Sequence, residues 1–388
     1  MPRIRLSHLA WAAVLIAAGV WLGYQLAVSP VVSGSSGLVW ARIVGVVEEG
    51  MTDFGAGPQP YQLLRVEILS GEYAGSRFTM DYGLRQPRTE PSGLKEGDQV
   101  LVTASASPEG VIQVYFADFV RTGPLAWLAG AFILLILLVS RGKGLRALVG
   151  MALSLVVILK FILPQILAGR DPVLVSLAGS FVLLAVTFYL IHGWTLKSHT
   201  AVLATLGALV LTGALASVSV QAARLTGLGS EEAMFLIQFA GRDVNVRGLL
   251  LGGILVGALG VLDDLTINQI SAVFELRRAN PALPIGSLYR RAMVIGQDHI
   301  ASTVNTLLLA YVGASLPLLL LFSLFHEPAL AVLNREAIAE EVVRTLVGSI
   351  GLIAAVPLAT LLASAVSEHR HRIASWLGPE TTDADTAA

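Results

Sequence analysis

The chain has 388 residues, of which 55% are hydrophobic and 14% charged, with a net charge of −1 and a mean hydropathy of +0.72. A soluble domain carries about a quarter charged residues, so this composition excludes an ordinary soluble protein and predicts a polytopic membrane protein. The chain has no cysteine, which excludes disulfides, thiolate metal sites and cysteine nucleophiles.

Apolar stretches long enough to span a bilayer, about 20 residues each, recur along the chain. The sequence predicts eight such helices, at residues 8–28, 124–140, 146–168, 173–193, 200–223, 247–270, 301–325 and 343–366. The first follows Arg3 and Arg5, so a cleaved signal peptide is an alternative. It has no convincing cleavage site, however, and Trp21 and Tyr24 suit an interfacial anchor. We therefore predict a retained anchor.

The basic residues of the short loops predict the orientation. Twelve of them fall on one side of the eight-helix arrangement and six on the other. Because cytoplasmic loops carry the excess of Lys and Arg, both termini are expected in the cytoplasm of a bacterial cell. Residues 29–122 are then expected outside the cytoplasmic membrane.

Residues 29–122 have the pattern of a small β domain. Runs of β-branched residues alternate there with turn-rich pieces such as GAGPQP and KEGD, and we expect strands at 39–48, 63–69, 77–82, 99–105 and 111–119. Five short strands favour a small closed barrel of the OB-like kind. The segment has 7 basic and 11 acidic residues, so no nucleic acid is expected. The barrel would rest on the outer mouth of the bundle or dock a protein partner.

The predicted fold is therefore an all-α polytopic membrane bundle of about eight helices, with a small extracytoplasmic β-barrel inserted after the first helix. Its parts are an anchor at 1–28, the β-rich domain at 29–122, a seven-helix bundle at 123–368 and a cytoplasmic tail at 369–388. The tail is short, polar and acidic, which predicts disorder.

The helix expected at 247–270 combines glycines with acidic and amide side chains. At 3.6 residues per turn, one face carries Gly253, Gly257, Gly260, Asp264, Asn268, Ser271 and Glu275. Gly248 and Gly252, like Gly253 and Gly257, form small-xxx-small pairs that let another helix approach closely. A lipid-facing Asp costs at least about 2.5–3.5 kcal/mol, so this face is expected to point into the bundle or a water-filled cavity.

The two adjacent carboxylates, Asp263 and Asp264, are expected nearer the cytoplasmic surface, where a charge costs less, than the middle of the membrane. Asp264 lies about 25 Å along a helix that enters at residue 247, within the cytoplasmic third of the membrane, and Asp263 is rotated from it by about 100°. One alternative is an interfacial helix end without further function, with Glu275 paired to Arg278. The other is a functional polar site. Lys160, the other intramembrane charge, is expected to snorkel to the outer face.

A second polar stripe favours the functional site. The next helix carries Asp298, Ser302 and Asn305 on one face, and residues 281–293 before it are expected along the inner membrane surface. Consecutive helices meet at the same depth, so we predict an ion or solute cavity at the cytoplasmic mouth. It would be lined by Asp263, Asp264, Asn268, Asp298, Ser302 and Asn305, with Gly248, Gly252, Gly253, Gly257 and Gly260 for helix packing.

Enzymatic patterns are missing from the sequence. No Ser–His–Asp arrangement, phosphate loop or dinucleotide fingerprint is visible, and the seven histidines are scattered. We therefore expect no catalytic residues, no metal site and no cofactor. Oxygen ligands from the aspartates suit a hard cation, but no spacing specifies one.

The stretch LGVLDDLTINQISAVFELRRANP, followed by IGQDHIASTVNTLLLAYVGASLPLLLL, resembles the signature region of the YibE/F-like family of bacterial membrane proteins. The resemblance spans about residues 125–367 and implies a multi-pass membrane protein with an outer β-rich domain. It implies no substrate, because the family's molecular function is undetermined. A glycine-rich helix ending in Asp, with a Glu-Leu-Arg-Arg exit, is also similar to the SecD/SecF branch of the RND superfamily. That similarity implies a protonatable role for Asp264, although the helix count and the small outer domain depart from that pattern.

The sequence thus supports two functional hypotheses. The first is a secondary transporter or permease for an unknown small solute or ion, with a polar site at the cytoplasmic helix ends. The second is a non-transporting scaffold or envelope-assembly partner that acts through the outer β domain. Both require the lipid bilayer as surroundings.

Overall fold

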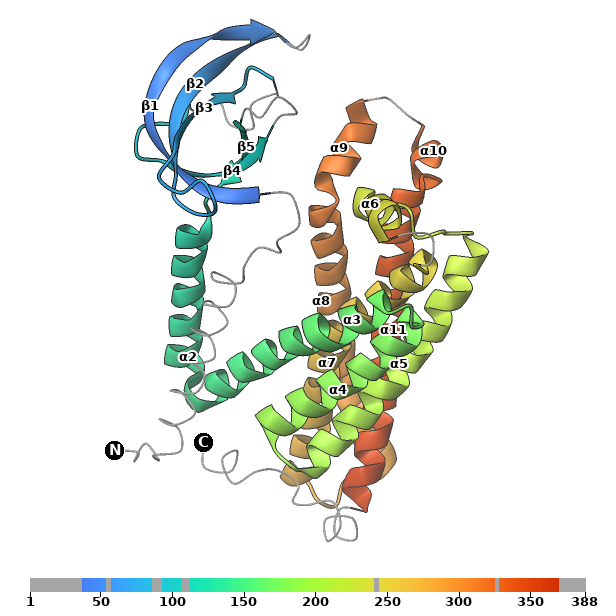
Figure 1. Ribbon diagram of the computed structural model, residues 1–388. Helices are drawn as coiled ribbons and strands as arrows, with labels where there is room; N and C mark the ends of the chain where they lie inside the picture. Colours follow the sequence, from blue (N-terminus) through green and yellow to red (C-terminus); the bar gives the residue numbers. More distant parts are fainter. Residues whose placement is uncertain are drawn as a thin grey trace, which may run out of the picture. The chain divides into compact units, whose positions relative to one another are not determined.

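The computed structural model of the protein describes residues 37–53, 57–85, 93–106, 112–240, 244–324 and 328–369 (Figure 1). The chain divides into two compact units, Met1–Gly142 and Lys143–Ala388. The anchor expected at 8–28 and the tail expected after His369 lie outside the described residues.

The first unit contains a closed five-stranded barrel. Its strands are β1 (Gly37–Asp53), β2 (Pro58–Ile68), β3 (Arg77–Tyr82), β4 (Gln99–Ala106) and β5 (Ile112–Phe119). They follow the order β1-β2-β3-β5-β4, in which β3 and β5 pair in parallel and the other neighbours are antiparallel. The small barrel predicted from the β-branched runs is therefore confirmed.

The two-residue period of the strands fills the barrel. On β2, Leu64, Val66 and Ile68 point into the core, whereas Arg65 between them is exposed. Gln62 enters the same core and is satisfied there. Its side chain accepts a hydrogen bond from the Leu94 amide at 2.8 Å and donates to the Leu94 carbonyl at 3.3 Å. The segment after residue 92 is thereby attached to β2.

Helix α2 (Thr122–Val157) follows the barrel and is interrupted at Arg141, whose φ of 47° and ψ of −124° are not helical. It continues through a π-helical turn at Ile158–Ile162 and α3 (Leu163–Leu167). The helices expected at 124–140 and 146–168 thus fall on either side of the interruption. By length and composition, Thr122–Leu167 counts as one candidate membrane span of 46 residues.

The second unit is helical. Its further helices are α4 (Pro172–His192), α5 (Leu196–Ala222), α6 (Glu231–Ala240), α7 (Val246–Ala279), α8 (Ile285–Ala314), α9 (Leu316–Leu324), α10 (Ala329–Leu333) and α11 (Glu336–Glu368). Among the described residues, five helices are long and apolar enough to cross a membrane, or six if the bent pair α8 and α9 counts as one span. The chain is thus mostly helical with several apolar spans, while a count of about eight is not established.

Helix α8 corrects one expectation. Residues 281–293 were expected to lie along the membrane surface, but Ile285 begins a helix that continues without interruption to Ala314. Pro284 precedes this helix, and no further proline follows until Pro317, beside which the chain bends by 60° into α9. The helix therefore begins earlier than the apolar pattern indicated.

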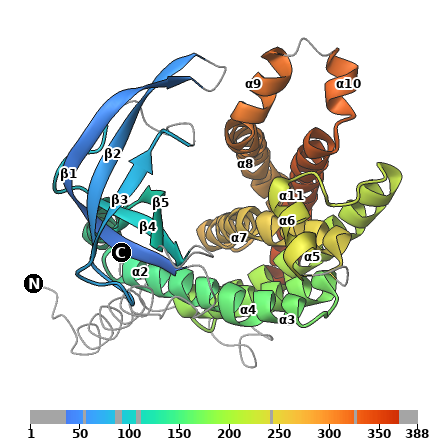
Figure 2. The same ribbon diagram turned by 45° about the horizontal axis from the view of Figure 1, so that its top comes forward.

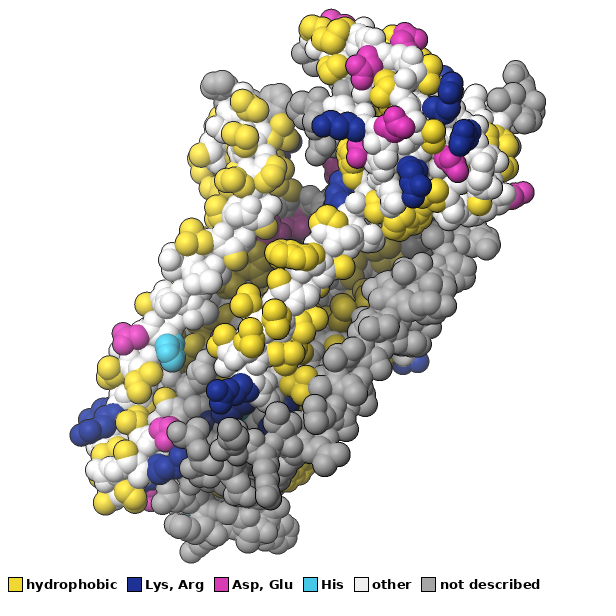
Figure 3. All heavy atoms as spheres, turned by 90° about the vertical axis from the view of Figure 1, so that its left-hand side faces the viewer, with side chains coloured by type: hydrophobic (Ala, Val, Ile, Leu, Met, Phe, Trp, Pro, Cys, Tyr) yellow, Lys and Arg dark blue, Asp and Glu magenta, His cyan; other side chains and the backbone are white. Residues whose placement is uncertain are grey.

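Helix α7 lies between α4 and α8 (Figure 2) and packs against α4, α5, α8 and α11. The core around it is apolar and includes Phe188 of α4, Leu209 of α5, Leu262 of α7 and Leu352 of α11, all nearly inaccessible to solvent. The surfaces of the other helices are apolar as well. Figure 3 shows one face of the molecule, on which hydrophobic side chains cover much of the helical surface and charges are most frequent on the barrel.

Candidate functional site on helix α7

Local sequence signals determine where α7 begins and ends. The Asn245 side chain accepts a hydrogen bond from the Gly248 amide at 2.8 Å and so caps the first turn. No proline interrupts the next eight turns, and Asn280 and Pro281 stop the helix. The result is a 34-residue helix, long enough to extend beyond the hydrocarbon at one end.

Two of the predicted packing glycines lie against α4. A Cβ at Gly252 would come within 2.5 Å of Ser176 Oγ and 3.2 Å of the Pro172 carbonyl oxygen. A Cβ at Gly248 would lie 3.0 Å from Pro172 Cδ. The absence of side chains at these two positions therefore allows α4 to pack directly on the α7 backbone.

The other predicted stripe lies on the surface of the bundle. Between Gly253 and Glu275, the exposed residues of α7 are Gly253, Gly257, Gly260, Asp264, Asn268 and Glu275, and we call this set the open face. Added Cβ atoms at Gly253 and Gly260 would meet nothing within 4 Å, and one at Gly257 would meet only the Tyr311 hydroxyl, at 3.5 Å. Ser271, at the edge of the face, is half-buried.

The sequence predicted that Asp264 points into the bundle or into a water-filled cavity. Among the described residues, Asp264 lies on the exposed open face and not in the packed interior. The rest of the helix circumference carries large apolar residues such as Ile254, Leu255 and Leu262, and these fill the core against the neighbouring helices. Burying that wider apolar arc leaves only the glycine and polar stripe outside. Asp264 stays at the surface, where its Oδ1 accepts a hydrogen bond from Asn268 Nδ2 at 3.2 Å.

The composition of the open face is unlike that of the other spanning helices. Large exposed apolar side chains occur on α4 (Phe181), α5 (Leu211), α8 (Leu309) and α11 (Ile350), as expected for surfaces that contact lipid. Helix α7, which the structure describes over its whole length, exposes none. The open face is therefore suited to water or protein rather than to hydrocarbon.

The second stripe, Asp298, Ser302 and Asn305 on α8, is also exposed. Helix α8 packs through a different face, with Leu288, Ala292, Gly296 and Leu307 buried.

Tyr311 lies beside Gly257, and Gln269 contacts Ala292. Helices α7 and α8 are antiparallel, so these two contacts fix which residues lie at the same level along the helix axes. By this count Asp264 of α7 lies near the level of Ser302 of α8. The polar stripes of α7 and α8 thus lie at a similar level along the helix axes. Among the described side chains of these two stripes, the hydrogen bond between Asp264 and Asn268 is the one that joins two members.

Asp263 lies at the edge of the open face and is half-buried. Its carbonyl oxygen accepts a hydrogen bond from the Thr266 hydroxyl at 3.1 Å. Within the described part of the chain its carboxylate has no hydrogen bond or ion pair. Asp263 and Asp264 therefore occupy different surroundings, as the rotation of about 100° between consecutive residues predicts.

Behind the open face lies a buried polar network that the sequence did not reveal. Gln269 Nε2 donates to Thr360 Oγ1 of α11 at 2.8 Å and to the Ala292 carbonyl of α8 at 2.9 Å. Thr266 and Thr205 of α5 form a hydroxyl pair at 2.6 Å. Gln269 and Thr266 are polar residues within an apolar run, but they lie off the predicted stripe. This network connects α5, α7, α8 and α11.

Arg277, near the end of α7, has a buried role that the sequence did not reveal. Its side chain is only 5% exposed and donates to Glu368 Oε2 at 2.7 Å and to the Leu283 carbonyl at 2.7 Å. Arg278 is the exposed member of the pair, and it bonds Glu275 at 3.0 Å. The arginine with the buried role could not be identified without knowing the orientation of the helix.

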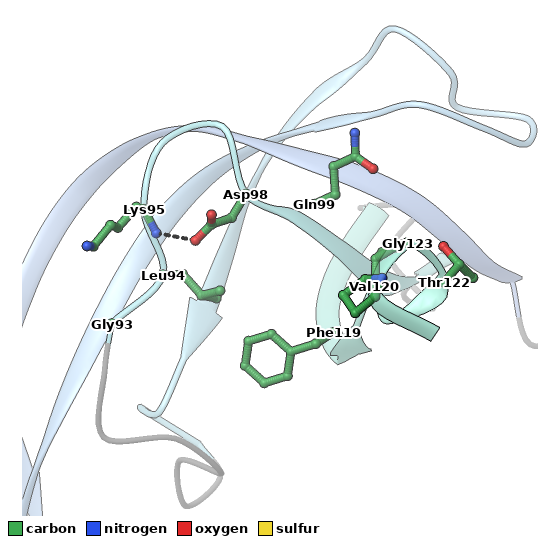
Figure 4. A pocket seen from close by; sticks show the side chains of 10 residues that line it. Gly93, Leu94, Lys95, Asp98, Gln99, Phe119, Val120, Thr122 and Gly123 are labelled. Atoms are coloured by element: carbon green, nitrogen blue, oxygen red, sulfur yellow. Dashed lines mark hydrogen bonds between the residues drawn. The ribbon is translucent and has the colours of Figure 1, made fainter. Parts of the chain in front are cut away.

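Each unit also has a hollow on its described residues. In the first unit a pocket of about 690 Å³ lies where the barrel joins the start of α2, lined by residues that include Leu94, Asp98, Gln99, Phe119 and Thr122 (Figure 4). In the second, an apolar pocket of about 180 Å³ lies between α8, α9 and α11. Among the described residues, no three His, Asp or Glu side chains are grouped to hold a metal ion.

Lys160 lies in the π-helical turn before α3, and its side chain is exposed. Its turn packs against α3 and α4. The open face lies on α7, where Asp264 is sixteen residues, or about 24 Å, from Gly248, the residue beside the start of α4. Lys160 is therefore no part of this candidate site.

The comparisons with known proteins agree with the resemblance seen in the sequence. A family model described as YibE/F-like protein matches residues 128–369, more than half of the chain, and this range includes the open face and α8. Comparison with curated proteins and with solved structures gave no match. The chain belongs to the YibE/F-like family.

Proposed function

We propose that this protein is a secondary transporter or permease of the bacterial cytoplasmic membrane and not an enzyme. Both termini would lie in the cytoplasm and the barrel outside. The observation that carries the proposal is the open face of α7, where Asp264 and Asn268 form a polar pair on a membrane helix that exposes no large apolar residue. The transported species would be a small solute or ion.

The cost of placing a carboxylate in lipid supports a hydrated path at this face. An Asp at the centre of a membrane helix costs at least about 2.5–3.5 kcal/mol, and hydrocarbon offers it no compensation. Water beside the open face removes most of that cost. In the proposal Asp264 binds a proton or cation, and Asn268 donates a hydrogen bond to its carboxylate.

The remaining predicted residues would extend this path. Asp298, Ser302 and Asn305 lie exposed on α8 near the same depth, and Asp263 lies at the edge of the open face. Gly253, Gly257 and Gly260 add no side chains above Asp264, so that stretch offers a smooth surface to a moving neighbour.

Proton flux into reconstituted vesicles tests the proposal. The full chain is placed in vesicles that contain a pH-sensitive dye, and a potassium diffusion potential drives protons inward. Asp264→Asn is expected to reduce the protein-dependent flux at least about tenfold, since the amide cannot release a proton. Glu275→Gln, on the same face near the helix end, is expected to keep it. Equal flux for Asp264→Asn and the unsubstituted protein would exclude Asp264 from the path.

A second function is favoured by the barrel. The strand order β1-β2-β3-β5-β4 with a parallel β3–β5 pair supports an OB-like assignment, and the pocket of about 690 Å³ offers a place for a partner's side chain. In this case the protein is an envelope scaffold that binds a protein partner through the outer domain. A chain lacking residues 35–118 distinguishes the two functions, because a scaffold loses all activity and a transporter keeps its flux.

A further inference from the structure

We propose that the open face of α7 is the contact surface between two copies of this chain, which lie side by side in the membrane with their α7 helices parallel. The inference rests on exposure and packing and goes beyond transport. In a transporter the second copy would form the other wall of the hydrated path, and in a scaffold it would pack against the face.

Lipid does not fit the open face. From Gly253 to Gly260 the exposed positions of α7 have no side chains, and Asp264 and Asn268 follow directly below them. Acyl chains gain little from bare backbone and nothing from a carboxylate, whereas a second helix gains close van der Waals contact and hydrogen bonds. Within the described residues of the second unit, the neighbouring helices α4 and α8 flank the face without covering it.

A second copy fits the open face because the face has a glycine half and a polar half. A partner must present a close-packing surface to the glycines and polar groups to Asp264, each at the same depth in the membrane. All copies insert with one orientation, so a partner's glycines arrive at the depth of Gly253, Gly257 and Gly260. Its polar residues likewise arrive at the depth of Asp264. Gly253 and Gly257 are four residues apart, the spacing at which two parallel helices pack with their backbones in contact.

The polar half of the face is also self-complementary. Asn268 uses one amide N–H for Asp264 Oδ1 of its own helix, so its second N–H can reach the Asp264 carboxylate of the other copy. The same bond forms in the reverse direction, because a two-fold axis relates the two helices. The four side chains would thus close a ring of donors and acceptors.

Disulfide crosslinking tests the proposal with little ambiguity, because the chain has no native cysteine. Gly260→Cys places a thiol where a Cβ meets nothing within 4 Å, so the substitution leaves the single chain undisturbed. In vesicles of phosphatidylethanolamine and phosphatidylglycerol, oxidation is expected to convert Gly260→Cys into a covalent dimer. Ile350→Cys, on the lipid-facing surface of α11 with 49% exposure, is the control expected to stay monomeric.

A size variant gives an independent measurement. Gly253→Leu adds a side chain to the open face, where the single chain has room for it, and is expected to raise the dimer dissociation constant at least about tenfold. Gly313→Leu, at another helical glycine with nothing within 4 Å, is the matched control and should leave the constant unchanged. Unaltered thermal unfolding of the Gly253→Leu monomer would show that the chain still folds.

Two results would overturn the proposal. One is a monomeric unsubstituted protein at every concentration in lipid, with no Gly260→Cys dimer. The other is an intrachain disulfide in the double variant Gly19→Cys and Gly260→Cys without any interchain product. That result would assign the open face to the N-terminal segment of the same chain. Proton flux in the Asp264→Asn test can fail or succeed independently of both results.

Discussion

Arg277 Nη2 lies 2.7 Å from Glu368 Oε2, and this ion pair connects the end of α7 to the end of α11. Arg277 is almost fully buried, whereas half of the Glu368 side chain is exposed. The guanidinium also satisfies the Leu283 carbonyl in the connection to α8. One side chain therefore holds together three segments at the cytoplasmic side of the proposed topology.

Arg277→Ala is expected to lower the free energy of unfolding by about 1.5–3 kcal/mol, because it leaves the buried Leu283 carbonyl without its charged donor, whereas water can solvate the half-exposed Glu368 carboxylate. Arg278→Ala is the neighbouring control. Its exposed pair with Glu275 is worth less than about 1 kcal/mol. Denaturant titration of the purified monomer in detergent measures both. Equal losses for the two arginines would contradict the buried role of Arg277.

Adjacent residues on α7 test which side of the helix is buried. Gln269→Ala removes the bonds to Thr360 and Ala292 and opens a cavity, so a loss of about 2–4 kcal/mol is expected. Asn268→Ala, on the open face, should change the stability of the monomer by less than about 0.5 kcal/mol. The same titration compares them. A larger loss at Asn268 would show that the open face is buried within one chain.

Two adjacent glycines give a third comparison. Gly252→Ala forces a methyl group to within 2.5 Å of Ser176 Oγ, and overpacking of this kind costs about 1–3 kcal/mol. Gly253→Ala meets nothing within 4 Å, so alanine's higher helix propensity should stabilise the monomer by up to about 1 kcal/mol. Thermal unfolding of the monomeric fraction should therefore shift in opposite directions. A shift of the same sign for both would mean that α4 does not approach Gly252 closely.

Much of the fold followed from the sequence because its signals are local. The β-branched runs of the first unit form the strands of the closed barrel, and Asn245 and Pro281 bound α7. The continuous helix α8 was missed at its start, since residues 285–293 are polar enough to indicate an interfacial segment. Polarity marks where a helix leaves the hydrocarbon, but only the backbone breakers mark where the helix stops.

The candidate site depended on tertiary structure to a greater degree. The sequence by itself determined that Gly253, Gly257, Gly260, Asp264 and Asn268 share one face of a helix, because 3.6 residues per turn place them there. Only the packed structure decided that this face lies outside and that Gln269 and Arg277 lie inside. In water the apolar side of a helix is the buried side. In a membrane both the lipid and the core are apolar, so hydrophobicity alone does not separate them, and the packing of α4, α5, α8 and α11 against α7 makes the distinction.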